Sequence, residues 1–140
     1  MKSKAPLALM EQLVMLLVFA LAAALCLQMF ALSHRLSENS ERLDHAVMAV
    51  QNAAETVKLC SGDPGSYPEL LGGMGDDRQW QIGFDSEWKP APLETAQYRI
   101  LIQPETVSQP LLGSAQITAQ TSEGESLFQV VVSWQEEAYE

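Results

Sequence analysis

The most hydrophobic stretch of the chain, residues 13–32, lies near its N-terminus and carries no charged side chain. As an α-helix, a run of about twenty residues covers about 30 Å, which matches the hydrocarbon core of a bilayer. Residues 13–27 are apolar on every side of such a helix, whereas a helix in the core of a globular domain usually keeps one polar face. The pattern therefore predicts a transmembrane helix, which we place at residues 7–32.

A short basic segment, residues 1–6, precedes this helix and contains Lys2 and Lys4. By the positive-inside rule, it holds the N-terminus in the cytoplasm and places the C-terminal residues outside. A removable signal peptide is the alternative, but its apolar region spans only about 7 to 15 residues, and this run continues further. We expect a single-pass membrane protein whose first partner is membrane lipid.

The helix is predicted to continue beyond the membrane as an extracytoplasmic half, residues 33–59, because this segment lacks Gly and Pro. Apolar residues recur in it every seven positions and form a narrow stripe. Packing of this stripe on the chain's own C-terminal domain is the favoured interpretation, and a coiled coil with a partner is the alternative. The predicted packing stripe consists of Leu36, Leu43, Val47, Val50 and Val57.

The remainder of the chain alternates in a way that predicts strands. Residues 60–78 are rich in Gly and Pro and are expected to form a connecting loop. Residues 79–140 are expected to form an antiparallel sheet of three to four strands, with Gly124 in the last hairpin turn and Pro104 ending one strand. The fold class is therefore α+β, with the long N-terminal helix packed on the sheet. The predicted strand faces begin at Trp80, Tyr98, Ala115 and Phe128, and Trp88 is a candidate for a short additional strand.

Acidic charge is concentrated in the C-terminal part of the chain. Residues 61–140 contain three basic and thirteen acidic side chains, whereas residues 1–60 are neutral. An acidic domain repels phosphate backbones, so we do not expect nucleic-acid binding. No catalytic or cofactor-binding motif is recognisable, so the expectation is a protein that is not an enzyme, without cofactor or small-molecule substrate. Asp76 and Asp77 are weak calcium candidates, since they lack a regular ligand spacing.

The segment LALMEQLVMLLVFALAAALCLQMF combines a basic leader, an apolar helix and one early glutamate, Glu11. It resembles the type IV pilin-like proteins, which include pilus subunits and the pseudopilins of type II secretion. The resemblance implies a long helix packed on a four-stranded sheet, and assembly with other pilin-like subunits through the N-terminal helix. FDSEWKP, residues 84–90, is similar to a hairpin found in some Gram-positive pilin-like sequences.

The resemblance implies an assembly role for Glu11, which would pair with the free N-terminal amine of a neighbouring subunit. A carboxylate at membrane depth costs several kcal/mol unless it is neutralised or paired, so a partner is expected. Solvation of Glu11 at the headgroup level is the alternative. The resemblance also implies leader removal near Pro6 and Leu7, but Pro6 stands where the family has Gly or Ala, so a permanently membrane-held protein remains open.

The two cysteines, Cys26 and Cys60, are 34 residues apart. On one continuous helix this separation is about 50 Å, too far for a disulfide within one chain. Cys60 is either a lone thiol or a bridge to another chain. Two functions remain: a minor pilin or pseudopilin subunit of a pilus or secretion filament, and a bitopic cell-envelope protein that binds a partner through its heptad helix and acidic domain.

Overall fold

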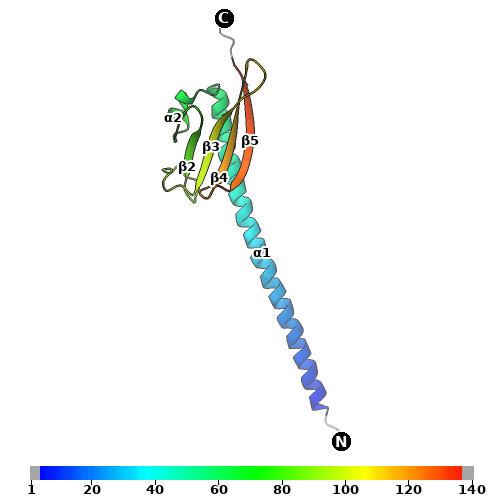
Figure 1. Cartoon of the computed structure of the whole chain (residues 1–140). Coiled ribbons are helices and arrows are strands. Elements are labelled where there is room, and N and C mark those ends of the chain that lie inside the picture. The colour runs from blue at the N-terminus through cyan, green and yellow to red at the C-terminus, as the bar shows by residue number, and fades with distance from the viewer. Residues whose placement is uncertain (1–3, 137–140) are drawn as a thin grey trace. The chain divides into compact units, whose positions relative to one another are not determined.

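The computed structural model describes residues 4–136, so Lys2, the rest of residues 1–3 and residues 137–140 lie outside the described part. The chain divides into two compact units, Met1–Glu41 and Arg42–Glu140. The boundary falls within the first helix, α1 (Ala5–Leu59). The second unit contains the last turns of α1 and the whole sheet (Figure 1).

Helix α1 ends at Leu59, the residue predicted from sequence. Ser61 and Gly62 follow it in the left-handed region, with φ of 52° and 71°. The Gly62 amide donates a hydrogen bond to the Val57 carbonyl at 2.8 Å, which is a common way to close a helix C-terminus. A Cβ at Gly62 would also lie 2.0 Å from the Trp134 ring, so glycine is required here for space as well as conformation.

The segment at residues 60–78 is more regular than the loop we predicted. It contains a 3-10 turn, η1 (Pro64–Ser66), a short helix, α2 (Tyr67–Leu70), and a two-residue strand, β1 (Met74–Gly75). Asp63 caps η1 by accepting a hydrogen bond from the Gly65 amide at 3.1 Å. Tyr67 is buried, and its ring meets Trp80 edge-on at 5.7 Å. The prolines and glycines here start and end short elements, and do not exclude them.

An antiparallel sheet follows, and it confirms the α+β class. Its five strands lie side by side in sequence order, one more than the upper limit of our prediction, because β1 falls in the expected loop. Gly124 occupies the last hairpin with φ of 92°, as predicted. The remaining strands are β2 (Trp80–Phe84), β3 (Tyr98–Glu105), β4 (Leu112–Thr121) and β5 (Ser126–Gln135).

Two strand predictions were wrong in detail. Pro104 does not end its strand but lies inside β3, opposite Ala115 of β4. The pairing between β2 and β3 stops at Ile102, so β3 has no neighbouring strand on that side at Pro104. The N–H that proline lacks is therefore not needed for a hydrogen bond to β2. Trp88 starts no strand; beyond β2 there is only a single bridge between Phe84 and Pro90.

Two cross-strand rows supply the sheet side of the core. Partners opposite each other point to the same face of a sheet, so each row forms one continuous apolar line. Ile100 and Ile117 are fully buried in these rows. The first row is Trp80, Ile102, Ile117 and Val130, and the second is Ile82, Ile100, Ala119 and Phe128.

The helix side of the core differs from the predicted packing stripe. Val50 and Val57 are fully buried, but Leu43 is 42% exposed and Leu36 is 59% exposed. Val47 is only half-buried. The other buried positions of α1 are Ala46 and Ala53, three residues after Leu43 and Val50. The predicted stripe instead included Val47, which lies four residues after Leu43. Two alanines on this side allow the helix backbone to approach the sheet closely.

Truncation of the core row should destabilise the fold strongly. We expect Ile117→Ala to lower the free energy of unfolding by about 2–5 kcal/mol, because it removes a fully buried side chain and leaves a cavity. Val131→Ala is the matched control, since Val131 lies on the neighbouring strand and is 51% exposed. Denaturant titration of the full chain in detergent measures both, and equal losses would contradict this account of the core.

Stability should also decline at high pH through Tyr67. Burial raises the pKa of this phenol to about 12, with smaller contributions from Cys60 and Asp63. An unfolded tyrosine ionises at a pKa of about 10, so the stabilisation is present below pH 10 and is lost as the pH rises through 12. Tyr67→Phe should therefore show a smaller fall in unfolding free energy between these pH values, measured by denaturant titration; an unchanged pH dependence would exclude this role.

Candidate functional site

From Ala5 to Glu41, the first unit is an uninterrupted stretch of helix whose apolar side chains are all exposed. From Leu7 to Leu36, its large hydrophobic side chains are between 56% and 75% exposed. Helix α1 is long and apolar enough to be a candidate membrane span, by length and composition. Such a surface is unfavourable in water and has to be covered by lipid or by other helices.

Glu11 is the one acidic side chain in the apolar stretch at residues 5–32. One helical turn away on either side lie Leu7, Val14 and Met15, so its carboxylate projects from an apolar surface. Among the described residues, Glu11 has no hydrogen-bond or ion-pair partner. Lys4 lines the same surface depression as Glu11. In a bilayer or an apolar helix bundle, a carboxylate in this setting is stabilised by water or by a paired cation.

The predicted processing position falls in the first turn of α1. Pro6 and Leu7 are both helical and both exposed. Proline is well tolerated in a first turn, because the amide it lacks would have no helical partner there. This placement leaves leader removal a prediction.

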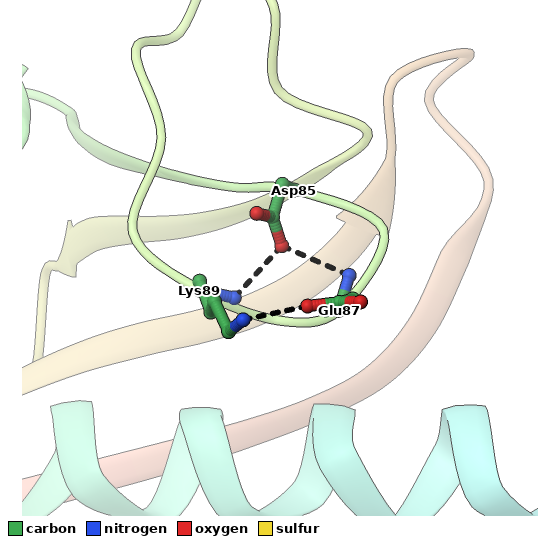
Figure 2. A network of polar contacts seen from close by, with 3 residues as sticks. All are labelled: Asp85, Glu87 and Lys89. Atoms are coloured by element: carbon green, nitrogen blue, oxygen red, sulfur yellow. Dashed lines mark hydrogen bonds and ion pairs between the residues drawn. The ribbon is translucent and has the colours of Figure 1, made fainter.

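The loop between β2 and β3 is built around Asp85, as Figure 2 shows. One oxygen of its carboxylate accepts hydrogen bonds from the backbone amides of Glu87 and Lys89, each at 2.9 Å. The Lys89 ammonium pairs with the Glu87 carboxylate at 2.6 Å across the same loop. The main chain closes it further, since the Asp85 amide donates to the Lys89 carbonyl at 2.9 Å. This network fixes the residue between Glu87 and Lys89.

That residue, Trp88, has φ of 60°, which is rare for a bulky side chain. Its indole stacks on Tyr98 with ring centres 4.3 Å apart, and on His45 of α1 at 6.3 Å. Phe84 lies 5.9 Å away. The aromatic contacts and the Asp85 network therefore hold a strained backbone in place and connect the loop to the helix.

A groove with a volume of about 350 Å³ lies beside this aromatic cluster in the second unit. It follows one face of α1 from His45 to Thr56 and is bounded on the other side by residues of α2, β2 and β3 and by Trp88. Sequence reasoning missed both the groove and the aromatic stack. The signal available was FDSEWKP itself, whose Asp three residues before a Trp is compatible with a side-chain-capped turn.

Asp76, one of the two weak calcium candidates, accepts hydrogen bonds within its own turn. Asp76 accepts hydrogen bonds from the backbone amides of Arg78 and Gln79, each at 2.9 Å. These bonds lower the pKa of Asp76 below its ordinary value, and the bond from the Arg78 amide contributes most. They also shape the turn between β1 and β2. Asp77 is exposed beside it. Within residues 4–136, no three His, Cys, Asp or Glu side chains group as a metal site would require.

Both cysteines are free thiols in the structure. Cys26 is exposed in the apolar half of α1. Cys60 is half-buried just after the helix, with its thiol 3.5 Å from the Val57 carbonyl. The half-buried position of Cys60 is compatible with both alternatives, a lone thiol and a bridge to another chain.

No protein-family model matches the chain, and no curated protein or solved structure is similar enough to count as a match. The pilin-like resemblance and the absence of enzymatic activity therefore remain predictions.

The Asp85 network can be tested directly. We expect Asp85→Ala to lower the free energy of unfolding by about 1–2 kcal/mol, because two backbone amides lose their acceptor, as at a helix cap. Asp85→Asn keeps an oxygen at this position and should cost less. Unfolding of the full chain in detergent, followed by tryptophan fluorescence, measures both, and an equal loss for the two variants would show that the acceptor is not what matters.

Proposed function

We propose that this protein is a pilin-like subunit, a minor pilin or pseudopilin, which assembles with other such subunits through the N-terminal half of α1. The observation that carries the proposal is that the two halves of one helix differ in burial. Its first half exposes every large apolar side chain, whereas Ala46, Val50, Ala53 and Val57 of its second half are buried on an antiparallel sheet. The proposed filament is a type IV pilus or a type II secretion-like pseudopilus.

The apolar half of α1 supports both a membrane-held and an assembled state. A surface that is apolar all round packs equally well against lipid tails and against other apolar helices. The subunit can therefore leave the bilayer for a bundle of its own kind without exposing this surface to water. We place the N-terminus in the cytoplasm and the acidic sheet domain outside, because Lys4 lies at the start of the helix.

Glu11 gives such assembly a register. Leaving a carboxylate unpaired in an apolar bundle costs several kcal/mol, so the alignment that pairs it with a neighbour's amine is favoured over shifted alignments. The amine is that of the neighbouring subunit's N-terminus, which removal of the residues before Leu7 would place close to the start of the apolar helix. Glu11 thus acts as a positioning residue for assembly.

A second candidate function is supported by two side chains of the predicted packing stripe. Leu36 and Leu43 follow Met29 at heptad spacing and remain exposed, at 59% and 42%. Side chains in this pattern are available for a coiled coil with another helix. The protein is in that case a bitopic envelope component whose helix and acidic domain bind a partner.

Substitution of Glu11 separates the two functions. We expect Glu11→Gln to reduce incorporation into filaments by about tenfold or more. The substitution leaves the neighbouring subunit's amine without its counter-charge, and an unpaired buried charge costs more than about 1.4 kcal/mol. The measurement is the amount of full-length chain recovered with sheared surface filaments from producing cells. Glu41→Gln, which removes an exposed acid further along the helix, is the matched control and should leave incorporation unchanged.

The coiled-coil function predicts the opposite effects of substitution. Under it, Leu36→Glu together with Leu43→Glu abolishes partner binding, and Glu11→Gln has no effect. Val50 is unsuitable for this test because it is fully buried in the core. Normal filament incorporation of Glu11→Gln would refute the pilin-like proposal.

A further inference from the structure

Strand β5 is the open edge of the sheet. The strand order places it last, with β4 on one side and no strand of the described residues on the other (Figure 1). Its ten residues, SLFQVVVSWQ, contain no charged residue, no Gly and no Pro. With respect to residues 4–136, one side of β5 therefore presents a row of backbone amides and carbonyls without a neighbouring strand, which is a template for a further strand.

The opposite edge of the same sheet is protected. Strand β1 has only two residues there and is followed at once by Asp76 and Asp77. A very short edge strand and charged side chains are the usual means by which proteins prevent pairing at an edge. At β5, only the register shift beside Ala119 and Gln120 interrupts the ladder, and it lies next to the hairpin. Most of β5 remains regular.

Side chains of β5 are also incompletely covered. Phe128 and Val130 are half-exposed, although their partners on β4, Ala119 and Ile117, are fully buried. On the other face of the sheet, Val131 is 51% exposed. A strand added beyond β5 would cover apolar surface on both faces while it satisfied the backbone groups.

The charges at the ends of β5 indicate which strand fits. Glu125 precedes the strand and Glu136 follows it, and both are exposed. When two copies pair antiparallel in full register, Glu125 of one meets Glu136 of the other, and in parallel pairing each glutamate meets its own copy. Like charges placed opposite each other destabilise a sheet in both arrangements. The second unit as a whole has fifteen acidic and five basic side chains, which adds to the repulsion between copies.

We propose that β5 binds an extended segment of another protein by strand addition, and that this segment is rich in β-branched residues and carries Lys or Arg at both ends. Backbone hydrogen bonds to β5 supply the affinity, and the basic ends pair with Glu125 and Glu136. The basic residues are about 36 Å apart, which is the extended length between these two glutamates. This binding site lies entirely within the second unit and does not depend on what the N-terminal half of α1 does.

The test uses the full chain in detergent micelles and three synthetic peptides. The first peptide alternates Val and Thr over the length of β5 and has one Lys at each end. The second replaces both Lys by Glu, and the third keeps Lys but has Pro at alternate positions, which removes the backbone donors. Hydrogen exchange of the β5 amides is followed by mass spectrometry, with the amides of β3 as the internal reference.

We expect the Lys-ended peptide to slow exchange in β5 by about tenfold or more, and the other two peptides to have little effect. The double variant Glu125→Lys with Glu136→Lys should reverse the preference, so that the Glu-ended peptide protects β5. The matched control, Glu69→Lys with Glu94→Lys, changes the net charge equally at exposed sites outside β5 and should keep the original preference.

Three results would overturn the proposal. Lack of protection by the Lys-ended peptide would show that the edge is not a binding site. Equal protection by Lys-ended and Glu-ended peptides would exclude the role of Glu125 and Glu136. Protection of β5 that rises with protein concentration, without peptide, would identify a second copy of this chain as the occupant.

Discussion

The structure of the second unit depends on the burial of one narrow face of α1 against one face of the sheet. Ala46, Val50, Ala53 and Val57 supply the helix side, and Ile100 and Ile117 lie at the centre of the sheet side. A sheet with one bare apolar face is not stable in water, and an isolated helical segment of this length is marginal at best. The helix segment and the sheet therefore stabilise each other, and most charged side chains of the unit are exposed, whereas Ser114 is buried.

The class of the fold was predictable from sequence because the spacing of apolar residues changes along the chain from a helical to a strand pattern. An apolar run is followed by a seven-residue repeat, and then by alternation with Trp80, Ile82, Tyr98 and Ile100 on one face. Two element boundaries were also predictable: the glycines and prolines after Leu59 end α1, and Gly124 lies in the last hairpin turn. These features are local, and local features are what a single sequence displays.

Features that depend on contacts between distant residues were not predictable. The choice between positions three or four residues after Leu43 is decided by how closely the sheet approaches the helix, which favours Ala46. The place of Pro104 inside β3 depends on where β2 stops, and the strained backbone of Trp88 depends on Tyr98 and His45. For the candidate site, sequence alone singled out Glu11, whereas the open edge at β5 required the strand order.

Trp134 joins three segments that are far apart in the sequence. Its ring fills the space where a Cβ at Gly62 would lie. A Cβ at Gly113 of β4 would come within 2.3 Å of the same ring. A methyl group at either glycine is thus excluded by the size of a side chain on another strand. A larger residue at position 113 is therefore compatible with the fold only together with a smaller side chain at position 134, whereas position 62 would still favour glycine because of its positive φ.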